Sequence, residues 1–277
     1  MRTSTRTRRA FATMLAGAVL VAGSLLGASS ATAAPALPAK MAALGDSITQ
    51  GTMTCSALFS CPTNSWSTGT TASVNSHASR LRAAGATLQT FNDSVVSSTS
   101  AALPGQATKA VGQGAQYVTI LIGANDACTK TVAGMTSTTV YQTNVQTALN
   151  TLAASGAQIF VASIPNLLRM YDLNKASLSA RFAWASLQVC QSLLANPTST
   201  AAADVDRRNQ VQQRVNEYNA VLATLCGVTP NCRFDGNAIA TYPFTRNDIS
   251  TRDYFHPSLA GQATIAAVTW PKTQWAS

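Results

Sequence analysis

The segment Lys40-Met-Ala-Ala-Leu-Gly-Asp-Ser47 sets a short apolar run directly before a glycine and two polar residues. An apolar run bounded by turn residues is typical of a strand that is buried on both faces of a parallel sheet. A second run, Gln116-Tyr-Val-Thr-Ile-Leu-Ile122, is rich in β-branched residues and ends at Gly123. Polar residues follow both runs, so candidate site residues fall where two predicted strands end.

The rest of the chain predicts strands that alternate with helices. Further short apolar runs predict strands at residues 87–91, 158–162 and 233–234. Apolar residues at helical spacing predict helices at residues 74–84, 140–152, 173–194 (with room for a break), 211–225 (closed by Gly227) and 258–270. Alternating strands and helices form a parallel sheet covered on both faces, so we expect an α/β fold with three layers, α/β/α.

Residues 1–33 are typical of a secretory signal peptide. Four arginines among the first nine residues precede an apolar run over residues 10–28, and Ala31-Thr-Ala33 provides a cleavage site. The run is short, rich in alanine and glycine, and followed by a cleavage site, which favours a signal peptide; a retained membrane anchor stays open. The pair Arg8-Arg9 also resembles a twin-arginine export signal, and the route of export stays open. We therefore expect cleavage near Ala33, a secreted protein, and one domain over residues 34–277.

The composition excludes several classes of function. The net charge of +9 includes four arginines of residues 1–33, so residues 34–277 hold 15 basic and 10 acidic residues and a charge of +5. These basic residues are scattered, and binding of nucleic acid is not expected. His77 and His256 are the only histidines, which excludes a multi-histidine zinc centre. We expect a monomer that needs neither a metal nor another cofactor.

Six cysteines in an exported chain predict disulfide bonds, because the compartment is oxidising. Two pairs of cysteines are each six residues apart, which favours two local loops and leaves the remaining two cysteines to pair with each other. Other connectivities, and free buried thiols, stay open. The expected pairs are Cys55–Cys61, Cys226–Cys232 and Cys128–Cys190.

Three groups of polar residues lie where the loops of a parallel sheet converge, at the carboxyl ends of its strands. Gly45-Asp46-Ser47 follows the first strand, Asn125-Asp126 follows the strand that ends at Ile122, and Asp253-Tyr-Phe-His256 lies near the end of the chain. Together they provide a nucleophile, a donor for an oxyanion, a general base and a carboxylate that orients the base. These are the groups that acyl transfer requires.

The same three groups resemble the sequence blocks of the SGNH (GDSL) hydrolases. The matching residues are Gly45-Asp-Ser-Ile-Thr-Gln-Gly51, Gly123-Ala-Asn-Asp126 and Asp253-x-x-His256-Pro257, in the family's order and across nearly all of residues 34–277. The resemblance implies a flavodoxin-like parallel sheet of about five strands and ester hydrolysis without a metal. Gly45-x-Ser47-x-Thr49 lacks the second glycine of the G-x-S-x-G elbow, which distinguishes it from the α/β-hydrolase motif.

The resemblance assigns a role to each polar residue of the blocks. Ser47 is expected to be the nucleophile, His256 the general base and then the acid, and Asp253 the carboxylate that orients His256. The Ser47 backbone N–H and the Asn125 side chain are expected to bind the oxyanion. Structural roles stay open: a helix cap for Ser47 or Asp253, and a turn residue for Asn125. His77 is interpreted as a packing or capping residue, and Asp46 and Asp126 as acceptors that structure loops.

One block departs from the family pattern. After its second strand the family usually has a glycine whose N–H helps to bind the oxyanion, and Asn92-Asp-Ser-Val-Val-Ser97 places Ser97 at that position. The backbone N–H is retained, but a Cβ is added, which matters if the position needs a positive φ. Ser97 is therefore a further oxyanion-hole candidate, beside Ser47 and Asn125.

Three further segments resemble secreted bacterial phospholipase A/B-like enzymes of the same family: Cys61–Gly69, Asn75-Ser-His77 and Leu103-Pro-Gly-Gln-Ala107. This resemblance implies that the substrate is a small-molecule or lipid ester, such as a phospholipid or glyceride, with transient contact to a lipid surface. A charge of +5 fits such a surface without identifying it. Two alternatives stay open: deacetylation of a polysaccharide, and a binding protein without catalytic activity on the same scaffold.

Overall fold

Apolar runs that are buried on both faces form the three central strands of one sheet, and the two edge strands are only partly buried. The computed structural model describes residues 1–3, 34–56 and 60–276, so the signal peptide predicted for residues 1–33 lies almost entirely outside the described residues. Five parallel strands lie in the order β2-β1-β3-β4-β5. They are β1 (Lys40–Gly45), β2 (Gln89–Asn92), β3 (Tyr117–Leu121), β4 (Gln158–Val161) and β5 (Cys232–Phe234). Every predicted strand is present, with its ends shifted by two residues at most.

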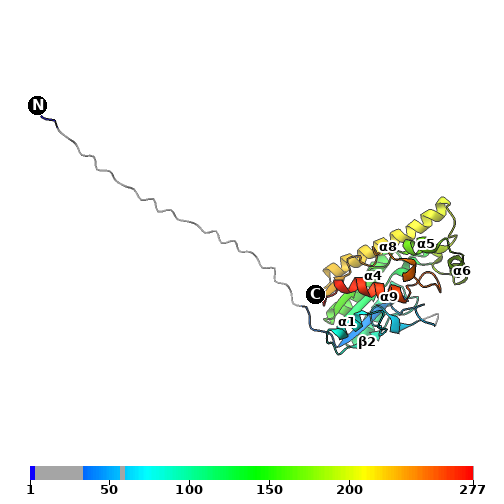
Figure 1. Ribbon diagram of the computed structural model, residues 1–277, viewed down its shortest axis with the longest axis horizontal. Coiled ribbons are helices and arrows are strands. Elements are labelled where there is room, and N and C mark those ends of the chain that lie inside the picture. Colours follow the sequence, from blue (N-terminus) through cyan, green and yellow to red (C-terminus); the bar gives the residue numbers. More distant parts are fainter. Residues whose placement is uncertain (4–33, 57–59, 277) are drawn as a thin grey trace. The chain divides into compact units, whose positions relative to one another are not determined.

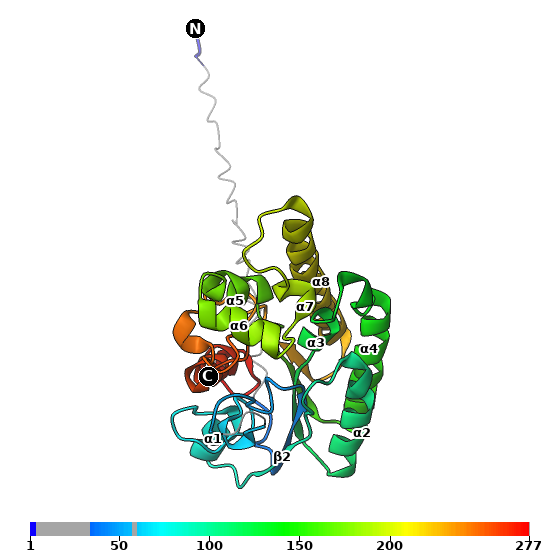
Figure 2. The ribbon, with the colours of Figure 1, turned by 90° about the vertical axis from the view of Figure 1, so that its right-hand side faces the viewer.

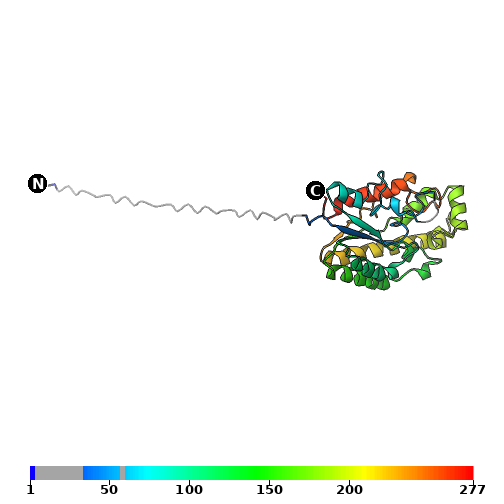
Figure 3. The same cartoon turned by 90° about the horizontal axis from the view of Figure 1, so that it is seen from below.

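Helices cover both faces of this sheet (Figure 2, Figure 3). One face carries α2 (Leu103–Gly112), α4 (Thr138–Ala154) and α8 (Ala202–Val228), with α2 packed on α4 and α4 packed on α8. The other face carries α1 (His77–Ala83) and α9 (Leu259–Thr269). The architecture is therefore the three-layer α/β/α arrangement expected from the sequence.

Shorter helices lie in the segments that follow the strands. These are α3 (Ala124–Ala127), α5 (Leu167–Asn174), α6 (Leu178–Ser186) and α7 (Gln191–Leu194). Single 3-10 turns occur at Pro62–Asn64, Ser100–Ala102, Val132–Gly134, Arg246–Asp248 and Trp270–Lys272. None of the helices in the described residues has the length and apolar character needed to cross a bilayer.

The helices differ from the expected pattern at three places. The stretch 173–194, for which a break was left open, is divided among α5, α6 and α7. Gly227 does not close α8, which continues to Val228. Helix α2 was not predicted, because Pro104 and Gly105 in its first turn resemble a turn signal, although proline is well tolerated at the start of a helix.

The strand order places a topological switch point between β1 and β3, where ligands bind in sheets of this kind. At this point β1 ends at Gly45, which has φ 139° and lies so close to β3 that a Cβ would come within 2.1 Å of the Leu121 carbonyl oxygen. The Gln106 side chain of α2 binds both backbone groups of Gly45: its Oε1 accepts from Gly45 N at 2.8 Å, and its Nε2 donates to Gly45 O at 2.9 Å. These contacts fix the backbone of Gly45, and therefore the place where the segment after β1 begins.

His77 of α1 contacts residues of β3 and α9, inside the helical layer that α1 and α9 form. Its Nδ1 lies 2.9 Å from the Tyr117 hydroxyl, and its Nε2 lies 2.8 Å from Thr269 Oγ1. The fully buried ring also contacts three aromatic rings edge-on, those of Trp66, Phe160 and Trp270. Burial, with a smaller contribution from Arg80, lowers the pKa of His77 to about 3. His77 is thus a packing residue, as predicted.

We predict that His77 makes the fold lose stability in mild acid. Below pH 6.5 the unfolded chain binds a proton at this histidine, but the folded chain does not until about pH 3, so the free energy of unfolding falls as the pH drops through this window. The contribution should approach about 1.4 kcal/mol per pH unit. Urea unfolding between about pH 7 and pH 4 measures this slope. His77→Gln is the control, and equal slopes for the two proteins would contradict the prediction.

Candidate active site

Ser47 lies in the turns that follow β1, with its hydroxyl directed to a histidine. No helix begins in residues 46–56, so Ser47 is not a helix N-cap. Its side chain is largely buried, and its Oγ lies 2.8 Å from Nε2 of His256. At this distance the imidazole can accept the hydroxyl proton without rearrangement.

His256 and Asp253 come from the loop before α9. Nδ1 of His256 forms a hydrogen bond with Oδ2 of Asp253. The other carboxylate oxygen, Oδ1, accepts the backbone N–H of Phe255 at 3.0 Å and of His256 at 3.1 Å. Burial raises the pKa of Asp253, but the hydrogen bond and charge of His256 and the two N–H donors outweigh it, so the pKa lies below its ordinary value. Asp253 therefore both contacts the imidazole and caps the turn, which the sequence left as alternatives.

Ser97 and Asn125 lie in the same pocket as Ser47, Asp253 and His256. The backbone of Ser97 has φ 64°, so this position does adopt the left-handed conformation that a glycine would favour. Nδ2 of Asn125 donates to the Ser98 carbonyl at 2.9 Å. This bond orients the amide and leaves its second hydrogen for a ligand. The structure thus brings all five residues together, and their catalytic roles stay predictions.

The two remaining aspartates of the blocks are buried and structure the loops around the site. Oδ1 of Asp46 accepts the Ile48 N–H at 2.9 Å, and burial raises the pKa of Asp46 to about 7. Asp126 accepts from the N–H and the hydroxyl of Ser100 at 2.8 and 2.7 Å, and burial raises its pKa as well. These bonds match the predicted structural role of both residues.

The pocket has a volume of about 450 Å³ and one wall that the sequence analysis did not assign to the site. This wall is the segment Leu187–Cys190, which lines the pocket together with Val96 and Ser97. The disulfide Cys128–Cys190 fixes the segment beside α3. A signal was available, because the predicted pairing joins Cys190 to a cysteine only three residues after Asn125.

Two of the three predicted disulfides are present, Cys128–Cys190 and Cys226–Cys232. The predicted pair Cys55–Cys61 is wrong, because the buried Cys61 forms no disulfide in the described part of the chain; its sulfur lies 3.7 Å from Thr63 Oγ1. Within the described residues no cluster of histidine, cysteine, aspartate and glutamate side chains is suited to hold a metal ion.

A model of the GDSL-like lipase/acylhydrolase family matches residues 43–264, from β1 into α9. The chain belongs to this family. The resemblance to SGNH hydrolases is thereby confirmed, and the chain is a member of a family of carboxylic ester hydrolases. No curated protein matches the chain.

Solved structures show the same fold as this GDSL-family chain. LAE5, an α/β hydrolase enzyme from the metagenome of Lake Arreo, Spain, has a TM-score of 0.55 and 15% identity, over 86% of this chain and 96% of LAE5. Axe2, an acetylxylan esterase from Geobacillus stearothermophilus, has a TM-score of 0.51 and 16% identity, over 83% of this chain and 91% of Axe2. At these identities the similarity establishes the fold alone.

We predict that the disulfide at the pocket contributes more stability than the one at the end of α8. Cys128–Cys190 closes a loop of 62 residues and Cys226–Cys232 one of six, and the loop-entropy model gives about 4 and about 2 kcal/mol respectively. Urea unfolding of the double serine variant at each pair, Cys128→Ser with Cys190→Ser and Cys226→Ser with Cys232→Ser, measures both losses. A larger loss at Cys226–Cys232 would contradict the prediction.

Proposed function

We propose that the chain is a secreted serine esterase that cleaves acyl esters of phospholipids or glycerides through an acyl-enzyme. The observation that carries this proposal is the hydrogen-bonded series Ser47–His256–Asp253, which lines a pocket together with apolar side chains. A protein that only binds a ligand would not need this series. The signal-peptide pattern of residues 1–33 supports secretion.

In the proposed mechanism Ser47 Oγ attacks the ester carbonyl carbon while Nε2 of His256 takes the hydroxyl proton. Asp253 keeps the other imidazole proton on Nδ1 and stabilises the imidazolium that forms. The Ser47 and Ser97 N–H groups and the Asn125 amide donate hydrogen bonds to the oxyanion. His256 then gives its proton to the leaving alcohol, and the acyl group stays on Ser47. A water molecule, activated by His256, releases the acid.

The lining of the pocket supports an acyl chain as the group that is transferred. Apolar side chains line the same pocket as the nucleophile; they are Met53, Val96, Leu187, Val189 and Phe255. An acyl chain that contacts these side chains removes apolar surface from water, which stabilises the complex by up to about 0.8 kcal/mol per buried CH₂ group. A polysaccharide acetyl group would leave most of these walls unused.

We predict that Ser47→Ala and His256→Ala each lower kcat for a short-chain nitrophenyl ester by at least about 10³-fold, because each removes one member of the proton-transfer series. Asp253→Asn should lose less, since backbone carbonyls can also orient an imidazole. Steady-state kinetics measure the loss, and circular dichroism checks that each variant folds. Substantial activity of Ser47→Ala would show that the nucleophile is a different residue.

We also predict that kcat/KM rises with the length of the acyl chain. From acetyl to longer nitrophenyl esters, each CH₂ that enters the pocket should raise kcat/KM by up to about fourfold. A panel of esters from acetyl to palmitoyl, together with phosphatidylcholine vesicles and acetylated xylan, measures this preference. A maximum at acetyl with release of acetate from xylan would instead favour a polysaccharide acetyl esterase.

A further inference from the structure

A second cavity lies beyond the carboxyl ends of β4 and β5. It has a volume of about 730 Å³, and among the described residues none lines both this cavity and the active-site pocket. Its lining comes from three segments, which are residues 166–169 after β4, residues 237–243 after β5, and residues 216–220 of α8. Because the five strands are parallel, the cavity and the active site belong to the same edge of the sheet. The proposed mechanism uses none of the residues that line this cavity.

Hydrogen bonds hold the three segments together. Asn219 of α8 binds both backbone groups of Ile164: its Oδ1 accepts the N–H at 2.8 Å, and its Nδ2 donates to the carbonyl at 3.0 Å. The buried Asp235 accepts the Ser163 hydroxyl at 2.7 Å and the Asn237 N–H at 2.9 Å. These bonds fix the loops after β4 and β5 relative to each other and to α8.

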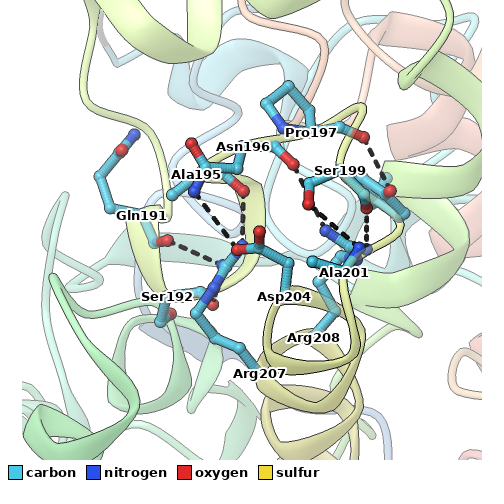
Figure 4. Close-up of polar contacts among 11 residues, drawn as sticks. Gln191, Ser192, Ala195, Asn196, Pro197, Ser199, Ala201, Asp204, Arg207 and Arg208 are labelled. Carbon is cyan, nitrogen blue, oxygen red and sulfur yellow. Dashed lines mark hydrogen bonds and ion pairs between the residues drawn. The ribbon is translucent and has the colours of Figure 1, made fainter.

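Helix α8, which forms one wall of the cavity, is held in place along its length. It lies beside α5 and packs on it (Figure 1). Figure 4 shows Arg207 and Arg208 reaching from the first turns of α8 to the backbone of residues 191–199. Both guanidinium groups donate to backbone carbonyls; the acceptors are those of Gln191, Ser192, Ala195, Asn196 and Ser199. The wall that α8 supplies is therefore preorganised for a ligand.

The lining offers several hydrogen-bond donors. The side-chain oxygens of Asn166 and Asn216 are occupied, by the Arg169 N–H and by Gln212 Nε2, each at 2.8 Å. Their Nδ2 groups are left as donors to a ligand. Nε of Arg169 donates to the Phe244 carbonyl at 3.0 Å, which leaves its two terminal nitrogens. No other group in the described part of the chain binds these donors.

An acceptor and an aromatic ring complete the lining. Thr241 Oγ1 donates to the Asn237 carbonyl at 2.8 Å and keeps its lone pairs for a ligand. The half-buried Tyr242 ring packs edge-on against the buried Phe244, with the ring centroids 4.9 Å apart. An aromatic ring held in this way provides an apolar face beside a hydroxyl group.

A sugar fits this combination better than an anion does. Each sugar hydroxyl both donates and accepts hydrogen bonds, whereas an anion uses donors only. Arg169 is the one charged residue among the described residues of the lining, and the acidic Asp235 binds the same loop as Asn237, which disfavours an anion. The volume of about 730 Å³ is larger than a phosphate or sulfate ion fills and suits a ligand of about two or three sugar rings.

We propose that this cavity is a binding site for a neutral oligosaccharide, separate from the catalytic pocket. Sugar hydroxyls bind the free amide and guanidinium donors of Asn166, Asn216 and Arg169, and one sugar ring stacks on Tyr242. The site goes beyond the esterase function and does not depend on it. A glycan bound here holds the chain at a glycan-bearing surface without occupying the active-site pocket, because the two linings are separate.

Isothermal titration of the full chain with trisaccharides tests the proposal. The probes are xylotriose, cellotriose and tri-N-acetylchitotriose, and at least one should bind with a Kd of about 1 mM or lower. Asn216→Ala should raise this Kd about fivefold, because one hydrogen bond is lost. Tyr242→Ala should raise it by about as much, because the stacking face is lost.

Asn150→Ala is the matched control for Asn216→Ala. Asn150 is exposed on α4 and accepts from Gln146 Nε2 at 2.8 Å, which is the arrangement of Asn216 with Gln212 on α8. The control should keep the Kd of the parent chain. Alanine suits an exposed helix position, so both variants should fold, and circular dichroism checks this.

Each further outcome decides for or against the proposal. No binding of any probe at about 10 mM, or equal Kd values for Asn216→Ala and Asn150→Ala, would overturn it. A sugar that competes with a nitrophenyl ester and keeps its Kd in Asn216→Ala would bind in the catalytic pocket, which overturns it as well. Saturable binding of phosphate without binding of any sugar would make the cavity an anion site instead. Sugar binding that depends on Asn216, in a parent chain that cleaves no ester, would retain the sugar site and reject the esterase.

Discussion

The hydrogen bond between Ser47 and His256 joins residues that are 209 positions apart in the sequence. The sheet, α2 and the loop before α9 hold the two side chains within hydrogen-bond distance. On one side, Gly45 permits the close approach of β1 to β3, and Gln106 fixes its backbone. On the other side, Asp253 holds the imidazole and the turn that carries it. The switch point of the sheet therefore determines where the site lies, and the flanking loops are held against it.

Much of the fold could be predicted because strands buried on both faces leave an unmistakable pattern. The apolar runs of β1 and β3 and the one-turn spacing of Asp253 and His256 are local features, so the sequence alone indicates them. The break between α6 and α7 is different, because the apolar pattern continues while Gln188 and Cys190 adopt left-handed backbone beside a disulfide. Such breaks depend on tertiary contacts. The same break creates the pocket wall, so this part of the site could not be placed from local pattern.

Ser97 shows a second limit of inference from sequence. The pattern identified a position where a glycine is usual, but only the structure shows that its backbone has φ 64°. A side chain in this conformation carries a cost of about 1 kcal/mol or more, which surrounding contacts must offset. Here the Val95 N–H donates to Gly45 O at 3.1 Å, and Asn92 Nδ2 donates to Thr49 O at 3.0 Å. These bonds tie the loop to the residues around the nucleophile, so the Ser97 N–H keeps its place.

The central claim is that Ser47 is a nucleophile activated by His256, and covalent capture tests it most directly. The chain is treated with an alkyl fluorophosphonate, and the adduct is located by intact-mass measurement and peptide mapping. The account predicts one adduct per chain, on Ser47, and a labelling rate that falls by at least about 10³-fold in His256→Ala. An adduct on a different residue, or equal labelling rates with and without His256, would contradict it.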